Sequence, residues 1–242
     1  MTSSDLWTAE AAERYDESST AMFRPEVLDP TVDRLVGLAC GGRVLELAVG
    51  TGRVAIPLAE RGVDVSGIEL SQPMVDRLHA KRPDLPVVVG DMAAATVPGE
   101  FSLVYLVFNT LGNLRTQAEQ VACFRNAARH LGPGGRFLVE IGVPSLRRLP
   151  PGQTAVPFDV SDGHLGVDTY DLVGQQGTSH HWTREEDGRF RYGVHHYRYV
   201  WPEECDLMAQ LAGLEPESRW STWQGDPFTG DSESHVSVWR RP

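Results

Sequence analysis

The chain has 242 residues, 41% of them hydrophobic, and a formal net charge of −11, which suits one α/β domain with additions. This acidic balance, with no basic stripe to neutralise phosphates, excludes nucleic acid from the expected partners and favours a small-molecule substrate. The three cysteines are too far apart in the sequence to indicate a disulfide framework. No apolar run is long enough for a leader or a membrane span. We therefore expect a cytoplasmic protein.

The first 42 residues are predicted to form a helical cap. Thr8 is a suitable N-cap for a helix that includes Tyr15. A second helix is expected after Pro25, because proline is favoured in the first helical turn, and it should end at the Gly41–Gly42 pair.

Residues 43–143 alternate between short apolar strands and helices. Helices are expected over three segments and strands over five, in the order strand 44–48, helix 53–61, strand 63–68, helix 71–81, strand 86–89, strand 101–108, helix 116–131 and strand 136–142. Short apolar strands joined by helices are typical of parallel strands that crossover helices bury on both faces. Right-handed crossovers make this a doubly wound, Rossmann-like sheet, so the segment is predicted to be the cofactor-binding core.

After this core the pattern changes to alternating residues rich in Tyr, Trp, His and Thr. We interpret 144–201 as an antiparallel insertion after the fifth strand, with a three-stranded meander over 164–201. Residues 202–242 are expected to form a closing helix and two strands. The whole chain is therefore predicted to be one domain, with a mostly parallel seven-stranded sheet and a C-terminal antiparallel strand.

The ends of three predicted parallel strands carry acids, and the first is followed by alternate glycines. Glu46 lies late in the first strand, and Gly50 and Gly52 form the turn that lets the backbone approach a ligand closely. Glu69 ends the second strand, where an acid accepts hydrogen bonds from a ribose. Asp91 ends the third, where it can bind an exocyclic amine. Open α/β sheets bind ligands at this carboxyl edge, so these residues predict a nucleoside-type cofactor.

This ordered set resembles the class I S-adenosylmethionine-dependent methyltransferases. Their first motif matches Glu46, Gly50 and Gly52, their second-strand acid matches Glu69, and their third element matches Gly90-Asp91-Met92. Ala48 departs from the family, which usually has glycine there, and places a methyl group near the methionine portion of the cofactor. The resemblance covers residues 40–142 best. It implies S-adenosylmethionine as the cofactor and S-adenosylhomocysteine as the product.

The resemblance also implies roles for individual residues. Glu46 would contact the methionine amino group, Glu69 both ribose hydroxyls, and Asp91 the adenine amine. Asn109 and Asn113, after the fourth strand, would contact the substrate. The other residues expected at the cofactor are Tyr15, Ala48, Gly50, Gly52, Leu70, Met74, Met92, Phe108 and Asn109.

In layout the chain is similar to small bacterial amino-sugar N,N-dimethyltransferases, which place an N-terminal tyrosine over the cofactor and carry an antiparallel insertion. Tyr15 is therefore a candidate catalytic residue, beside the alternative that it only packs its helix on the sheet.

All but one of the 22 basic residues are arginine. We interpret this bias as that of a high-GC bacterial genome. We expect methyl transfer to a nitrogen or oxygen atom of a small natural-product or sugar intermediate.

Two other functions fit parts of the pattern. A nicotinamide dehydrogenase would explain the Gly50-x-Gly52-x-x-Ala55 spacing and the ribose acid Glu69, but not Glu46 or the antiparallel tail. A cofactor-binding regulator without activity would share the fold, because fold does not fix function.

Two pairs of neighbouring histidines in the insertion, His180–His181 and His195–His196, suggest a metal site or a general base. Neighbours on a strand point to opposite faces, so each pair offers one ligand per face and no metal is expected. A two-residue type I′ turn at 187–188 would place His180 opposite His195 and make both candidate catalytic bases. The alternative is that the sheet serves for solvation or for contact in a homodimer.

The segment 222–233 is long for a connection between two strands. The strand before it is expected to run parallel to the core strands, so the loop should lie over the reactive end of the cofactor. Trp223, Asp226 and Phe228 are therefore predicted to contact the substrate, and the alternative is that these aromatic side chains pack back on the sheet.

Overall fold

The computed structural model describes residues 9–18 and 20–242, so the predicted N-cap Thr8 lies outside the described residues. The chain begins with α1 (Ala9–Ser18), the short helix η2 (Thr20–Phe23) and α2 (Pro25–Ala39). Pro25 opens α2 as expected, and the helix ends before Cys40, whose left-handed φ of 49° stops it. The described residues before β1 are thus mostly helical.

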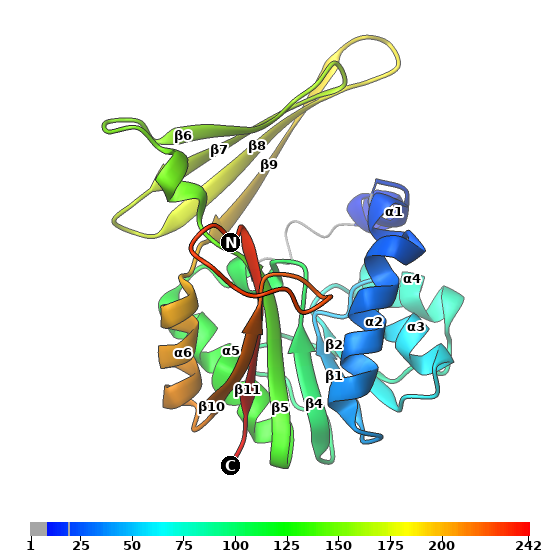
Figure 1. Ribbon diagram of the computed structural model, residues 1–242. Coiled ribbons are helices and arrows are strands. Elements are labelled where there is room, and N and C mark those ends of the chain that lie inside the picture. Colours follow the sequence, from blue (N-terminus) through cyan, green and yellow to red (C-terminus); the bar gives the residue numbers. More distant parts are fainter. Residues whose placement is uncertain (1–8, 19) are drawn as a thin grey trace.

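A seven-stranded sheet forms the core, in the order β10-β11-β5-β4-β1-β2-β3 (Figure 1). Within this sheet β11 runs in the direction opposite to the other six strands. The parallel pairs match the prediction. The strands are β1 (Val44–Leu47), β2 (Val65–Glu69), β3 (Val87–Val89), β4 (Phe101–Leu106), β5 (Leu131–Gly142), β10 (Glu215–Trp220) and β11 (Ser234–Arg240).

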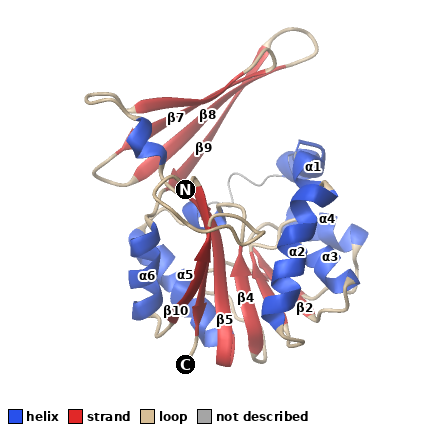
Figure 2. Ribbon diagram, in the orientation of Figure 1, coloured by secondary structure: helices blue, strands red, loops and turns tan. Residues whose placement is uncertain are grey.

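Helices cover both faces of this sheet (Figure 2). One face packs against α2, α3 (Ala55–Glu60) and α4 (Gln72–Lys81), through a buried cluster that includes Leu35 and Leu58. The other face packs against α5 (Gln117–His130) and α6 (Pro202–Leu211), around Phe124 and Trp239. Burial on both faces explains why the central strands are mostly apolar. No helix in the described part of the chain is long and apolar enough to cross a membrane.

The insertion forms a separate antiparallel sheet of four strands, not the three-stranded meander that the sequence predicts. Its strands are β6 (Ala155–Val160), β7 (His164–Asp171), β8 (Gln176–Arg184) and β9 (Phe190–Arg198). The additional strand, β6, contains Pro157 and lies at the edge of the sheet, where a missing N–H is tolerated. The proline hides this strand from a pattern-based prediction. Figure 1 shows the small sheet above the carboxyl edge of the large one.

The register between β8 and β9 differs by one residue from the prediction. Glu185 pairs with Arg189 and Gly188 N–H donates to the Glu185 carbonyl at 2.9 Å, so the loop has three residues. A type I′ turn needs positive φ at both of its central residues. Gly188 has φ of 82°, but Asp187 does not have a positive φ, so the predicted type I′ turn at 187–188 is absent. A slip of one residue reverses the faces of a strand relative to its partner.

As a result, His195 lies opposite Ser179, and His181 lies opposite Gly193. The predicted pairing of His180 with His195 is wrong, because His180 lies opposite Val194. Because Trp182 faces Tyr192, its ring packs against that ring at 5.3 Å.

A buried polar network fastens the small sheet to the core. The side chain of Arg198 at the end of β9 is only 4% exposed and pairs with Glu204 of α6 at 2.7 Å. It also donates to the amide oxygens of Gln175, at 2.8 Å, and of Gln120. Gln120 in turn donates to the Leu111 carbonyl at 3.2 Å. These bonds fix β9 against α5 and α6, and so position the face of the small sheet that looks toward the core.

Candidate active site at the carboxyl edge of the sheet

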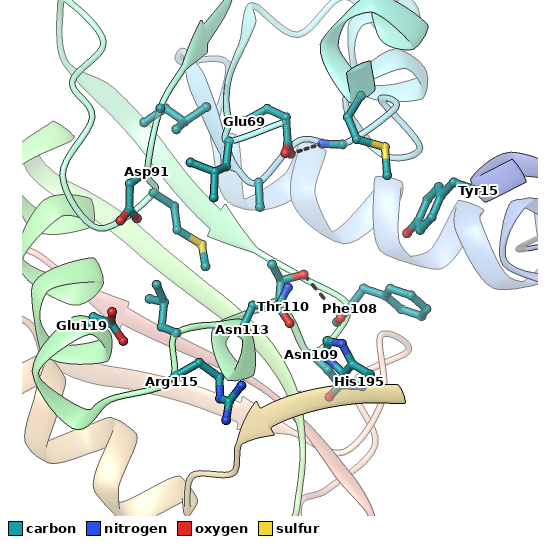
Figure 3. A pocket seen from close by; sticks show the side chains of 18 of the residues that line it. Tyr15, Glu69, Asp91, Phe108, Asn109, Thr110, Asn113, Arg115, Glu119 and His195 are labelled. Atoms are coloured by element: carbon teal, nitrogen blue, oxygen red, sulfur yellow. Dashed lines mark hydrogen bonds between the residues drawn. The ribbon is translucent and has the colours of Figure 1, made fainter. Parts of the chain in front are cut away.

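A cavity of about 710 Å³ lies between the carboxyl ends of the parallel strands and the small sheet (Figure 3). Many of the residues in its wall are among those predicted from the sequence: Tyr15, Ala48, Gly50, Glu69, Leu70, Met74, Asp91, Met92, Phe108, Asn109, Asn113 and His195. Gly90 and His181 also line it; the sequence analysis names them in a motif and among the candidate histidines but assigns neither to the site. The sequence analysis missed the others, which are Ile68, Thr110, Leu114, Arg115 and Glu119.

The turn after β1 is held in left-handed conformations. Ala48 has φ of 55°, Gly50 has 56° and Gly52 has 84°. A Cβ on Gly50 would meet no atom within 4 Å, so glycine is needed there for its backbone and not for space. A Cβ on Gly52 would lie 2.8 Å from Ile56, so this glycine permits close packing of α3. Gly52 does not line the cavity.

Glu69 pins this turn to the end of β2. Its two carboxylate oxygens accept the backbone N–H groups of Gly50 and Ser71, each at 2.9 Å. Burial raises the pKa of Glu69, although these N–H groups oppose the shift. A carboxylate at this position keeps lone pairs for further donors, because each oxygen can accept two hydrogen bonds.

Glu46 lies behind the turn and does not line the cavity. It is 3% exposed and accepts the hydroxyl of Tyr105 at 2.7 Å. Burial raises the pKa of Glu46 to about 8, against the opposing effects of the Tyr105 hydrogen bond and Arg53. Its predicted contact with a cofactor amino group stays a prediction.

Asp91 stands on the opposite side of the cavity from Tyr15 in Figure 3. Its Oδ1 accepts the N–H of Ala93 at 2.8 Å, which orients the carboxylate. Tyr15 is carried by α1, and the next residue ties that helix to the core. Asp16 accepts the Thr51 hydroxyl at 2.5 Å and pairs with Lys81 at 2.7 Å.

The turn after β4 contains two consecutive left-handed residues, Phe108 and Asn109, each with φ of 59°. Such conformations cost about 1–3 kcal/mol each and cluster at functional sites. Glu140 holds the turn by accepting the Phe108 N–H at 2.9 Å, and Asn109 accepts the Gly142 N–H at 2.6 Å. The Arg53 guanidinium lies 5.2 Å from the Phe108 ring centroid.

The loop 221–233 lies at this same edge, as the predicted topology requires (Figure 1). However, the described residues that line this cavity and a smaller one beside it do not include Trp223, Asp226 or Phe228. Trp223 donates its indole N–H to Glu140 at 2.8 Å, Asp226 accepts the Thr222 hydroxyl at 2.7 Å, and Phe228 packs edge-on against His235. Their direct contact with a substrate stays a prediction.

The roof of the cavity comes from β8 and β9, which contribute His181 and His195. The sequence-predicted His180 lies on the other face of the small sheet, where its Nδ1 is 2.7 Å from the Tyr192 hydroxyl. The three-residue loop that the structure contains places His181, and not His180, on the same face as His195. A prediction that used this loop would therefore have named His181.

A second cavity of about 380 Å³ adjoins the first and shares Asn109 and His195 with it. Its wall carries Asp168, which accepts the Ser179 hydroxyl at 2.5 Å and the Tyr170 hydroxyl at 3.2 Å. Burial raises the pKa of Tyr170 to about 12, so this phenol stays neutral at physiological pH. Among the described residues, no group of three or more histidine, cysteine or acidic side chains is arranged to hold a metal ion.

Comparison with known proteins gives consistent matches. Residues 44–135 match a family model described as a methyltransferase domain. The cypemycin N-terminal methyltransferase of a Streptomyces species is 31% identical over 208 residues, covering 83% of this chain and 84% of that protein.

Two solved structures are similar over most of the chain. The CcbJ methyltransferase from Streptomyces caelestis is 38% identical, with a TM-score of 0.78 and 88% of each chain covered. CalS10 from Micromonospora echinaspora, an amino pentose methyltransferase solved with S-adenosylmethionine bound, shares the fold at 21% identity. Its TM-score is 0.70, and the match covers 90% of this chain and 91% of that one.

Proposed function

The chain belongs to the class I S-adenosylmethionine-dependent methyltransferases, and on that premise we propose that it methylates the amino nitrogen of a small molecule. The observation that carries this proposal is the second cavity, whose wall contains the carboxylate of Asp168 and opens beside the cofactor cavity at Asn109 and His195. A carboxylate there attracts an ammonium group. Two of the similar proteins are named for amine substrates, an N-terminus and an amino pentose.

The residues around the first cavity fit S-adenosylmethionine. We propose that Glu69 accepts the ribose hydroxyls, because its oxygens already face the cavity edge while holding the Gly50 N–H. Asp91 is assigned to the adenine amine, with Leu70, Met74 and Met92 packed beside the ring. Glu46 is assigned to the methionine amino group through water, since it lies behind the turn that Ala48 begins.

S-Adenosylmethionine supplies a methyl group that is already activated, so the chain's task is orientation and exclusion of water. Tyr15 from α1 is proposed to close the cavity over the reacting atoms, where burial raises the pKa of its phenol and keeps it neutral. Asn109 and Asn113 offer side-chain amides on the acceptor side. His195, at the junction of the two cavities, is proposed to contact the acceptor.

The test is methyl transfer to matched pairs of acceptors. A dipeptide with a free N-terminus is paired with its N-acetylated form, and a 3-amino sugar with the corresponding 3-hydroxy sugar, each followed by mass spectrometry. We expect methylation of the amines and none of their partners. Transfer to the hydroxyl sugar, or to no amine in the panel, would overturn the proposal. Asp168→Asn should raise KM for the amine more than it lowers kcat, because it removes the charge that attracts the cation.

We also propose that the enzyme is a cytoplasmic homodimer. Cys40, Cys123 and Cys205 are free thiols, which suits a reducing compartment. The outer face of the small sheet carries Trp182 against Tyr192, and Tyr192 is 52% exposed. Light scattering should show a dimer for the unchanged protein and a monomer for Tyr192→Glu, whereas Arg189→Glu in the adjacent turn should leave the mass unchanged. A monomeric unchanged protein would refute the dimer.

A further inference from the structure

A row of three polar side chains crosses the small sheet from solvent to the cofactor cavity. Asp159 Oδ2 lies 2.6 Å from Nδ1 of His164, and His164 Nε2 lies 3.0 Å from Nδ1 of His181. The Asp159 side chain is 44% exposed and that of His164 is 23% exposed. His181 forms part of the cavity wall. The row therefore connects bulk water with the space in which the reaction takes place.

The backbone of the small sheet is shaped around these rings. The pairing of β6 with β7 shifts between Pro157 and Asp159, so that Phe158 is an extra residue on its strand. Phe158 packs on the ring of His181 at 5.3 Å and on that of His164 at 6.2 Å. Bulges of this kind turn side chains toward sites that a regular strand would not reach.

Glycines flank the inner histidine on both neighbouring strands. Gly166 lies opposite His181 on β7, and Gly193 lies opposite it on β9. A Cβ on Gly166 would come within 2.2 Å of the Phe158 ring. Gly166 thus leaves room for the Phe158 ring, which packs on the imidazole of His181.

The hydrogen bonds of the row fix the tautomer of each neutral ring. A carboxylate only accepts, so Nδ1 of His164 carries the proton that Asp159 receives. Neutral His164 then has a bare Nε2, which accepts the Nδ1–H of His181. Nε2 of His181 is left with its lone pair, and no described residue donates to it. The row therefore presents a proton acceptor at the cavity wall.

We propose that His181 is the general base for the acceptor and that Asp159 and His164 form its relay to solvent. This inference rests on the proposed methylation of an amine in the adjoining cavities. The ammonium form of the acceptor gives one N–H proton to Nε2 of His181, which frees the nitrogen lone pair. The Nδ1 proton of His181 passes to Nε2 of His164, and Asp159 stabilises the resulting imidazolium. The Nδ1 proton of His164 then passes to the exposed carboxylate of Asp159 and from there to solvent, which leaves His164 neutral.

The surroundings of His181 favour its neutral form, which is the form that accepts a proton. Burial, and then the neighbouring His164 and His180, lower the pKa of His181, while Asp168 opposes that shift. The ring is therefore neutral at physiological pH. Burial in the same cavity lowers the pKa of an ammonium group as well, while the Asp168 carboxylate opposes that shift.

His195 shares the cavity but lacks such a relay. It stacks on Tyr197 with ring centroids 6.2 Å apart, and no described residue forms a hydrogen bond that would fix its tautomer. His195 is better suited to contact the acceptor than to carry a proton away.

The first test reads the tautomers directly and needs no substrate. Long-range ¹H–¹⁵N NMR of the full chain, with the His181 signals assigned by loss in His181→Asn, should show protonated Nδ1 and bare Nε2. His164→Ala should convert His181 to the commoner Nε2–H tautomer, while His196→Gln, on the opposite face, should leave its signals unchanged. Protonated Nε2 on His181 in the unchanged enzyme would overturn the relay.

The second test uses the amine that the acceptor panel identifies. His181→Asn should lower kcat about 10²-fold or more with unchanged affinity for S-adenosylmethionine, as expected for the loss of a general base. Asp159→Asn should move the acidic limb of the kcat/KM profile to lower pH, because the lost charge no longer stabilises the protonated relay. Asp162→Asn, an exposed carboxylate in the same hairpin, should leave the profile in place.

The outcomes separate the two proposals. Full activity of His181→Asn, or an Asp159→Asn profile lowered evenly at every pH, would refute the base and its relay while leaving amine methylation intact. Failure to methylate any amine would refute the proposed function, and the NMR tautomers would then decide whether the relay exists.

Discussion

The carboxylate of Glu69 accepts the backbone N–H of Gly50 at 2.9 Å, so the end of β2 and the turn after β1 are held together by one side chain. The same carboxylate accepts the N–H of Ser71 at the start of α4. One residue thus shapes the cofactor turn and also faces the cavity that we assign to the ribose. Changing it should affect both properties.

Glu69→Gln is expected to weaken S-adenosylmethionine binding by one to two orders of magnitude, about the 1.5–3 kcal/mol of a hydrogen bond to a charged group. Isothermal titration calorimetry measures this directly. Glu60→Gln, an exposed acid at the end of α3, is the control and should leave the affinity unchanged. Unaltered affinity in a folded Glu69→Gln protein would remove the ribose assignment.

Ala48→Gly should stabilise the protein by about 1 kcal/mol, because Ala48 occupies a left-handed conformation with φ of 55° that glycine adopts without strain. The change also removes a methyl group from the cavity wall, so cofactor affinity should be equal or higher. Chemical denaturation is the measurement. The same substitution at Ala59, inside α3, should cost about 1 kcal/mol, and equal destabilisation by both variants would contradict the explanation.

The strand-end acids could be predicted from the sequence because their positions follow from local signals. Glu69 and Asp91 each end an apolar strand, and parallel strands bring their carboxyl ends to one edge. His181 could not be predicted in this way, because its face depends on the loop at Gly188. A two-residue and a three-residue loop share the Asp-Gly signal, yet they place opposite faces of β8 over the cavity.

Arg115 and Glu119 were missed for a different reason. Both follow the short helix η3 (Thr110–Asn113), and Glu119 reads from sequence only as the third residue of a capping box with Thr116. Arg115 is held at the cavity by Gln176 of the small sheet, at 3.1 Å. Such placement depends on how the two sheets meet, which no local pattern encodes.

Arg198→Met should destabilise the protein by about 3–5 kcal/mol, because it leaves Glu204 without the partner that offsets its desolvation. The Arg198 side chain is 4% exposed and that of Glu204 is 15% exposed, so solvent screens the pair little. Urea unfolding gives the free energy. Arg189→Met provides the comparison, since that side chain is 88% exposed and should contribute less than about 1 kcal/mol. Similar losses in both variants would show that Arg198 does not anchor the small sheet.

Glu46 predicts a dependence of stability on pH. Burial raises the pKa of Glu46 to about 8 in the folded chain from an ordinary 4.5. The folded state therefore binds the proton more tightly, and Glu46 should make the protein less stable as pH rises from about 5 to 8. Glu46→Gln should remove this part of the pH dependence and raise Tm most at pH 8. Parallel curves of Tm against pH for the two proteins would contradict the assignment.

Trp223→Phe tests whether the loop after β10 acts on the site indirectly. The indole N–H of Trp223 donates to Glu140 at 2.8 Å, and Glu140 in turn accepts the N–H of Phe108 at 2.9 Å in the cavity wall. Phenylalanine keeps the packing against α2 but loses the donor, so the strained turn at 108–109 should loosen. We expect kcat for the amine to fall several-fold, with a smaller loss of S-adenosylmethionine affinity, because Asn109 of this turn lies where the two cavities meet. Trp201→Phe, at the exposed start of α6, should leave both quantities as they are. If Trp223→Phe changes neither kcat nor KM, the hydrogen bond serves stability alone and the loop has no part in acceptor binding.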